Sequence, residues 1–293
     1  MAAFGSLFIA GTLKLCMATK IERKYLFASD FDQTLTFRDS GYVLCELIGV
    51  PTDEFERKAT GMAKLNLVQQ GAELAYLLLH DPEFRTKVRR EHLHEVGKKI
   101  RLKENVDLLF RALARGIGDA EFEPFVLSAA PVEIVRSALE GILPQDRIYG
   151  TEFRYSAGGE IDRIVRTTAG YGKVAAIEEL RSKLGIGPDH IIYVGDGSSD
   201  IHVMLHVNAH EGFTIAVSES MHVVPIAKRT VLSTNAFATL VPVFEKVFNW
   251  ERPKIRAFFE ENGVFIREWE RARTDWLTLG SAEQREIPAG SSN

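Results

Sequence analysis

Short apolar runs alternate with helical patterns along most of the chain. Apolar runs of strand length occur at 24–29, 122–128, 190–195 and 213–217. Between them, apolar residues recur at helical spacing, most regularly in 106–113 and 173–184, as expected for helices with one buried face. Strands that alternate with helices predict a parallel sheet with helices on both faces, which is an α/β fold.

Residues 41–100 depart from this alternation. Their apolar positions follow helical spacing without a convincing strand, and Gly49, Gly61 and Pro82 divide them into short pieces. We therefore expect an all-helical insertion in the α/β core. The predicted division of the chain is a core at 17–38 and 103–249, a helical cap at 39–102, a C-terminal helical extension at 250–280, and flexible termini at 1–16 and 281–293.

A hairpin and a further helix are predicted after the second strand. Residues 147–155 and 160–166 flank a glycine-rich turn at 157–159, which favours a β-hairpin. Pro131 is typical of the first turn of a helix, and we expect its helix to run to about Gly141.

The composition is ordinary for a globular protein, with 45% hydrophobic residues, 26% charged residues and a formal net charge of −4. A protein that binds nucleic acid or a membrane surface usually carries an excess of basic residues, and this chain has none. Two cysteines, Cys16 and Cys45, cannot build a framework of disulfides. A reducing compartment, the cytoplasm, is therefore the expected location.

The first 16 residues are apolar and need a separate interpretation. They lack a basic segment, and their apolar run is too short to span a bilayer. Met17 offers an alternative start to Met1. An extended start, a short ordered segment and a targeting signal all remain open here.

Polar side chains follow three of the predicted strands. Asp30 and Asp32 follow the first, Ser128 follows the second and Asp196 follows the third. The carboxyl ends of parallel strands meet at one edge of a sheet, where such folds bind their ligands. Asp30 and Asp32 fall on the same face of a strand, and two like charges are unfavourable there unless a cation or a proton offsets them.

Four short segments carry the chemistry. Each alone is weak evidence, because a serine can cap a helix, a lysine can lie on the surface and Gly-Asp-Gly can form a turn. In chain order they are Asp30-Phe-Asp-Gln-Thr34, Ser128-Ala-Ala, Lys173 and Gly195-Asp-Gly-Ser-Ser-Asp200. Together they resemble the haloacid dehalogenase-like (HAD) superfamily, in particular its phosphoserine phosphatase-like branch. The resemblance implies a Rossmann-like core with a helical cap inserted after the first motif.

The same resemblance implies a Mg²⁺-dependent phosphatase that hydrolyses a small phosphorylated metabolite. Asp30 matches the nucleophile that forms an aspartyl-phosphate, and Asp32 matches the general acid–base. The implied metal ligands are Asp30, the backbone carbonyl of Asp32, and Asp196, with Asp200 orienting Lys173 or a metal-bound water. The implied phosphate-binding groups are Ser128, the Ala129 amide and Lys173.

Asp32 narrows the chemistry within this family. Dehalogenases of the family lack the second aspartate, and its ATPase pumps replace it with threonine. Retention of Asp32 therefore implies hydrolysis of a phosphomonoester. A phosphotransferase with the same intermediate and a non-enzymatic phospholigand-binding protein remain alternatives.

The substrate is not settled by the motifs. Phosphoserine phosphatases carry an acidic residue at the position of Asp39, which reads the substrate amino group, and a cap arginine near the position of Ala72. No basic residue occurs from Leu65 to Leu79, so a substrate carboxylate would be unpaired. We therefore disfavour phosphoserine. Asp39 is interpreted either as a substrate contact or as the N-cap of a helix that begins near Ser40.

Two further patterns have alternative interpretations. His202, His206 and His210 share a helix face at i, i+4 and i+8, which suits a second metal site or ordinary helical neighbours. The aromatic stretch from Trp250 to Trp276 suits packing against the core or the contact surface of a homodimer.

Overall fold

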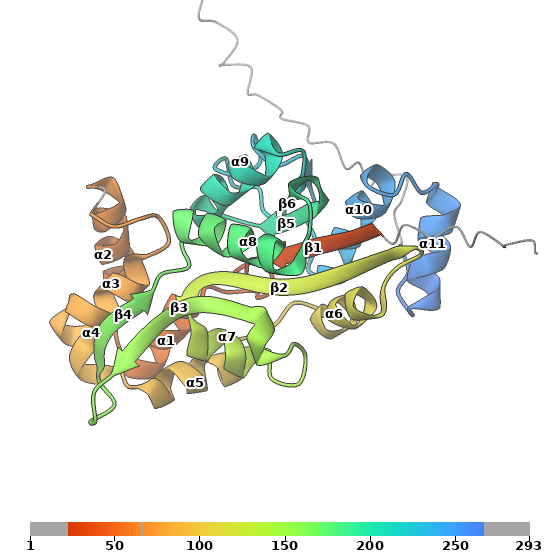
Figure 1. Ribbon diagram of the computed structural model, residues 1–293. Coiled ribbons are helices and arrows are strands. Elements are labelled where there is room, and N and C mark those ends of the chain that lie inside the picture. The colour runs from red at the N-terminus through yellow and green to blue at the C-terminus, as the bar shows by residue number, and fades with distance from the viewer. Residues whose placement is uncertain (1–22, 66, 267–293) are drawn as a thin grey trace, which may run out of the picture.

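The computed structural model describes residues 23–65 and 67–266, which form a sheet with helices on both faces (Figure 1). The sheet has the order β4-β3-β2-β1-β5-β6-β7, and only the β3–β4 pair is antiparallel. The strands are β1 (Arg23–Ser29), β2 (Ala120–Pro131), β3 (Ile148–Tyr155), β4 (Ile161–Arg166), β5 (Ile191–Gly195), β6 (Phe213–Ala216) and β7 (Arg229–Thr230). The predicted α/β fold and hairpin are confirmed, and the two-residue β7 was missed.

Side chains of β1 divide the core between the two faces of the sheet. Leu26 and Ala28 face α8 (Tyr171–Leu184) and α9 (Ile201–Ala209), whereas Phe27 faces the other side. That side is covered by α6, α7 and α10 (Val106–Arg115, Val132–Ala138 and Leu240–Lys246). Neighbouring strand residues point to opposite faces, so a continuous apolar run is buried on both sides.

The helix predicted to begin at Pro131 begins one residue later and is shorter than expected. Pro131 is the last residue of β2 and has extended backbone angles, φ −51° and ψ 131°. The helix ends at Ala138, and Gly141 adopts a φ of 77°, which a continuing helix does not allow.

Five helices form the insertion, and no strand lies among its described residues. They are α1 (Ser40–Ile48), α2 (Thr52–Lys64), α3 (Glu73–His80), α4 (Pro82–Lys87) and α5 (Arg90–Lys99). The insertion leaves and rejoins the core at one place, because Thr36 and Leu102 form an antiparallel bridge and Lys103 N donates to Leu35 O at 2.8 Å. Its boundaries as a separate domain stay a prediction.

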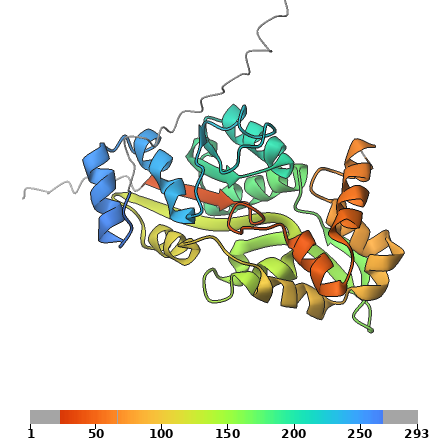
Figure 2. The ribbon, with the colours of Figure 1, turned by 180° about the vertical axis from the view of Figure 1, so that it is seen from behind.

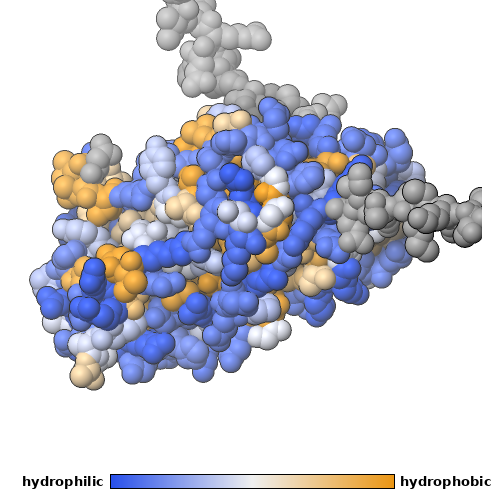
Figure 3. Space-filling view, viewed as in Figure 1, coloured by the Kyte–Doolittle hydropathy of each residue, from blue (hydrophilic) through white to orange (hydrophobic). Residues whose placement is uncertain are grey.

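The helices of the insertion occupy two positions. Helix α5 packs against α7 and α1 beside the core, whereas α2, α3 and α4 lie at the end of the molecule beside β4. Seen from behind in Figure 2, they lie at the opposite end from α11 (Arg252–Glu261). The surface in Figure 3 is mostly hydrophilic, with hydrophobic side chains gathered over the outer end of α2, where Leu65 and Leu67 are exposed.

The aromatic side chains of the C-terminal segment pack on one another. The ring centroid of Phe244 lies 4.6 Å from that of Trp250 and 4.8 Å from that of Phe258. The described part of the predicted aromatic stretch therefore packs within the protein, except for Phe265, which is exposed. The rest of that stretch, including Trp269 and Trp276, lies outside the described residues, and the homodimer stays a prediction. Among the described helices, none combines the length and apolar character that crossing a bilayer requires.

Candidate active site

The predicted site residues meet at the carboxyl ends of β1, β2 and β5, three adjacent strands. Asp30 follows β1, and its backbone N–H donates to Val194 O of β5 at 2.8 Å. Ser128 lies within β2, where the pairing with β3 shifts register between Leu127 and Pro131. The β2–β3 ladder is interrupted at this point, and Ser128 lines the same cavity as Asp30.

Lys173, in the first turn of α8, is completely buried behind Asp30. Its Nζ lies 2.9 Å from Asp30 Oδ1 and 2.6 Å from Asp200 Oδ1, and it donates to Ser199 Oγ at 3.3 Å. The two buried carboxylates raise the pKa of Lys173 above its usual value, although burial opposes the charged form. The ammonium group therefore stays charged and holds Asp30 in place.

Both oxygens of Asp200 are occupied by protein donors. Oδ1 accepts from Lys173 and from the Tyr193 hydroxyl, each at 2.6 Å. Oδ2 accepts the backbone N–H groups of Asp196 and Gly197 at 3.0 and 3.1 Å. A carboxylate with these contacts holds Lys173 and the backbone of residues 196–197 in place.

The acidic groups fit a hard divalent cation. Oxygens of Asp30, Asp196 and Asp200 lie within 4.8 Å of one another. Burial and then repulsion from Asp200 raise the pKa of Asp30 to about 7, and burial and repulsion from Asp30 raise the pKa of Asp196 well above its usual range. A cation would offset this repulsion, and carboxylate oxygens are the donors that Mg²⁺ prefers.

Asp196 is placed by two short contacts of its own. The Thr34 hydroxyl donates to Asp196 Oδ1 at 3.2 Å, and the Ser218 hydroxyl donates to the Asp196 carbonyl. The first bond positions the Asp196 carboxylate, and the second positions its backbone.

Asp32 is held by the first residue of α1. Ser40 donates to both of its oxygens, from the backbone N–H at 2.9 Å and from the hydroxyl at 2.8 Å. Burial, and then repulsion from Asp39 and Asp30, raise the pKa of Asp32 well above its usual range. A raised pKa favours the protonated form of the carboxyl group, which is the form that a general acid needs.

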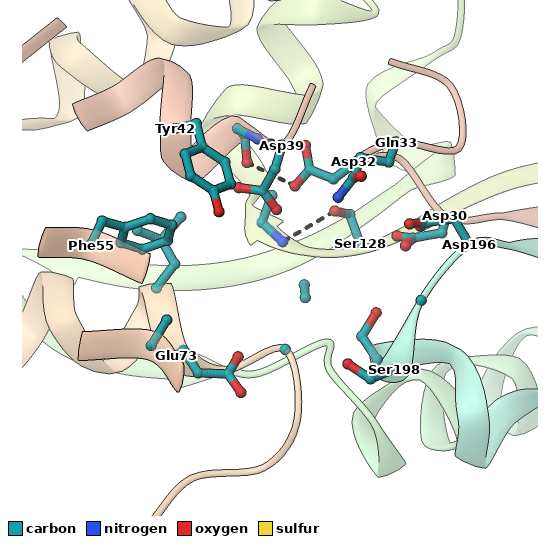
Figure 4. A pocket seen from close by; sticks show the side chains of 18 of the residues that line it. Asp30, Asp32, Gln33, Asp39, Tyr42, Phe55, Glu73, Ser128, Asp196 and Ser198 are labelled. Carbon is teal, nitrogen blue, oxygen red and sulfur yellow. Dashed lines mark hydrogen bonds between the residues drawn. The ribbon is translucent and has the colours of Figure 1, made fainter. Parts of the chain in front are cut away.

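A cavity of about 360 Å³ opens over these residues. The core contributes Asp30, Asp32, Ser128, Ala129 and Asp196 to its lining, and the insertion contributes residues of α1, α2 and α3 (Figure 4). Gly71, before α3, closes the cavity by approaching the core so tightly that an added Cβ would lie 2.7 Å from Ser199 Cβ. Lys173 is not part of the lining and lies behind Asp30.

Asp39 is the N-cap of a helix, and its contact with a substrate stays a prediction. Its Oδ1 accepts the Gly41 backbone N–H at 2.7 Å, which makes it the N-cap of α1. Its side chain also lines the cavity. Burial raises the pKa of this carboxyl group.

Several residues of the site were missed at the sequence level. Ser40 and Tyr193 belong to no recognised motif. The Glu73 carboxylate points into the cavity in Figure 4, but the sequence did not distinguish it from the other acidic residues. Ser40 alone had a local signal, because it follows Asp39 at a predicted helix start. Tyr193 and Glu73 reach the site only through the packing of β5 and α3.

The three histidines of α9 form no metal cluster within the described part of the chain. His206 Nε2 lies 2.8 Å from Glu178 Oε1, His202 stacks on Tyr171 with ring centroids 4.1 Å apart, and His210 contacts His206. The arrangement favours ordinary helical neighbours.

Comparisons with known proteins agree with this geometry. A family model described as haloacid dehalogenase-like hydrolase matches residues 27–205. Among curated proteins, none matches the chain.

Solved structures share the fold at low sequence identity. A gene product of Archaeoglobus fulgidus has a TM-score of 0.62 and 16% identity, over 83% of this chain and 88% of its own. A HAD family hydrolase of Salmonella enterica serovar Typhi has a TM-score of 0.61 and 16% identity, over 75% and 71% of the two chains. A substrate-bound phosphoserine phosphatase has a TM-score of 0.56 and 18% identity, over 73% and 95%.

The family match covers more than half of the chain and includes Asp30, Ser128, Lys173 and Asp200. The resemblance expected from the motifs is thereby confirmed. This chain belongs to the haloacid dehalogenase-like hydrolase family.

Proposed function

We propose that the protein is a Mg²⁺-dependent phosphatase that hydrolyses small phosphate monoesters through an aspartyl-phosphate on Asp30. The observation that carries this proposal is the meeting of Asp30, Asp32 and Asp196 at one cavity, with Lys173 paired to Asp30 from behind. Membership of a hydrolase family and a fold shared with phosphoserine phosphatase support the class of reaction.

Asp30 is the proposed nucleophile. Lys173 holds its Oδ1 at 2.9 Å, which leaves the other oxygen to attack the phosphorus. The attack forms a bond between Asp30 and the phosphoryl group and breaks the bond to the ester oxygen, so one difficult displacement becomes two easier ones.

Asp32 is the proposed general acid and then general base. Its proton moves to the ester oxygen as the alcohol leaves, and the two donors of Ser40 stabilise the resulting carboxylate. That carboxylate then takes a proton from a water molecule that attacks the aspartyl-phosphate. Inorganic phosphate leaves, and Asp30 and Asp32 return to their starting states.

The remaining residues position the phosphoryl group. Ser128 and the Ala129 amide are proposed to bind its oxygens from the cavity lining, and Lys173 balances charge from behind Asp30. Asp30, Asp196 and the Asp32 carbonyl would hold Mg²⁺, which would neutralise charge between the carboxylates and the phosphoryl group. The insertion 39–102 is proposed to act as a cap that covers the substrate.

Hydrolysis of p-nitrophenyl phosphate tests the proposal. We expect turnover that requires Mg²⁺, is lost with EDTA, and falls by at least about 1,000-fold in Asp30→Asn because the nucleophile is gone. Asp119→Asn is the matched control, since Asp119 is exposed at the opposite end of β2. Activity that survives both EDTA and Asp30→Asn would overturn the mechanism.

Analysis of the products separates hydrolysis from phosphotransfer. Reactions with added alcohols should still yield inorganic phosphate as the main product. Phosphorylated acceptor as the main product would show that the aspartyl-phosphate passes to an alcohol.

A further inference from the structure

Provided that the cavity hydrolyses phosphate esters as proposed, we infer that its preferred substrate is the phosphate ester of a small amino alcohol, with a cationic nitrogen and no carboxylate. The position of the ligand follows from Asp30 and Ser128, which line the core side of the cavity and determine where the phosphoryl group binds. The opposite side of the cavity then faces the alcohol portion.

The opposite side of the cavity is acidic. Asp39, Glu56 and Glu73, all from the insertion, line it, and Figure 4 shows the Asp39 and Glu73 carboxylates pointing into the open space from different helices. The Asp39 carboxylate accepts the Gly41 backbone N–H, and no basic side chain among the described lining residues faces it or Glu73. Among the described residues that line the cavity, none is lysine, arginine or histidine.

A cation would stabilise the charged forms of these carboxylates. Burial, with a smaller contribution from repulsion by Asp39, raises the pKa of Glu73, and burial raises the pKa of Asp39. Charged groups removed from water are stabilised mainly by an opposite charge. A substrate ammonium group placed between these carboxylates would supply that charge, while its phosphate remained at Asp30.

Two aromatic rings at the cavity also favour a substrate with a cationic nitrogen. Tyr42 and Phe55 line the cavity beside Asp39, with ring centroids 5.5 Å apart in an edge-to-face arrangement. Aromatic faces attract cationic nitrogen, including quaternary ammonium groups. The rings also offer apolar contact to methyl or methylene groups that surround the nitrogen.

The cavity also disfavours substrates with a second anionic group. A carboxylate on the alcohol, as in phosphoserine, would meet acidic side chains without a basic partner, and an unpaired charge of this kind is strongly rejected. The volume of about 360 Å³ is at the small end of ligand pockets, which suits a short aminoalkyl phosphate.

The test compares substrates of the same shape and different charge. We would measure kcat/KM for phosphocholine and for its neutral carbon isostere, 3,3-dimethylbutyl phosphate, together with phosphoethanolamine and phosphoserine. The cationic ester should exceed its neutral isostere by at least about tenfold, and phosphoserine should be a poorer substrate than phosphoethanolamine.

Glu73→Gln assigns the preference to the acidic side of the cavity. The ratio of kcat/KM for phosphocholine to that for the neutral isostere should fall several-fold in this variant. It should stay unchanged in Glu95→Gln, because Glu95 is exposed on α5 and paired with Lys99. Both kcat/KM values in the ratio are measured on the same variant, so a smaller fraction of folded protein lowers both equally and leaves the ratio unchanged.

Two results would overturn the inference and are distinguishable. Efficient p-nitrophenyl phosphate hydrolysis with equal turnover of the cationic and neutral esters would overturn the substrate class and leave the phosphatase intact. If the wild-type protein hydrolyses none of these phosphate esters in the presence of Mg²⁺, both proposals are wrong.

Discussion

Individual side chains in the site are arranged as a buried chain of charges. Lys173 lies between Asp30 and Asp200, and Tyr193 adds a neutral donor to Asp200. Removing one partner of such a network is costly because the remaining charge stays buried and unpaired. The geometry of Asp30 therefore depends on residues that do not line the cavity.

Tyr193→Phe tests this dependence by removing one hydroxyl. We expect the free energy of unfolding to fall by ~1–3 kcal/mol, because a buried carboxylate loses a donor that water cannot replace. Chemical denaturation provides the measurement. Tyr171→Phe is the control: Tyr171 is 64% exposed, and its change should stay within about 0.5 kcal/mol. Equal stability of Tyr193→Phe and the wild-type protein would show that Asp200 does not need this donor.

At the scale of elements, the insertion is joined to the core by a close helix contact. Gly97 of α5 packs on α7, and an added Cβ would lie 2.3 Å from Ile134 O and 2.6 Å from Ser137 Cβ. The Ser137 hydroxyl also donates to His94 O at 2.7 Å. Helix α5 therefore fixes one end of the insertion against the core, while α2 and α3 extend over the site.

Gly97→Ala should destabilise the protein, whereas the same change at Gly61 should stabilise it. The methyl group at 97 forces backbone atoms apart and is expected to cost ~1–3 kcal/mol. Gly61 of α2 has open space around its Cβ position, so alanine should add ~0.5–1 kcal/mol through helix propensity. Urea denaturation compares the two variants. A neutral Gly97→Ala would show that α5 can move away from α7 without loss.

The whole molecule combines a well-packed core with a strained acidic centre. Burial, and then repulsion from Asp200, raise the pKa of Asp30 to about 7. The ionised site is therefore less stable in the fold than the protonated site. Proteins accept such local strain where it serves function.

The metal-free protein should lose stability as the pH rises from mildly acidic to neutral. The folded-state pKa of Asp30 is about 7, above its ordinary value of 3.8, so the stabilisation from its proton is complete below the lower value and is lost as the pH rises to the higher one. Thermal unfolding in EDTA at a series of pH values measures this loss. Mg²⁺ should raise the unfolding temperature of the wild-type protein. If the wild-type protein becomes more stable over this pH range, the ionised Asp30 does not destabilise the fold.

The sequence by itself determined the order of elements and the main site. Strand and helix periods are local properties, so the alternation along the chain predicted the α/β core and the helical insertion. The motif residues Asp30, Asp32 and Asp196 follow strands, and strands that run in parallel must end at the same edge of the sheet. The sequence therefore predicted that these three aspartates lie close together.

Only the tertiary structure decided how these groups are held and what faces them. Ser128 lies where the pairing of β2 with β3 shifts register, and Tyr193 reaches Asp200 from inside a buried strand. Glu73 enters the cavity because α3 packs over the end of the sheet. These contacts join residues far apart in the chain, and they depend on how whole elements pack, which no local pattern of hydrophobic and polar residues specifies.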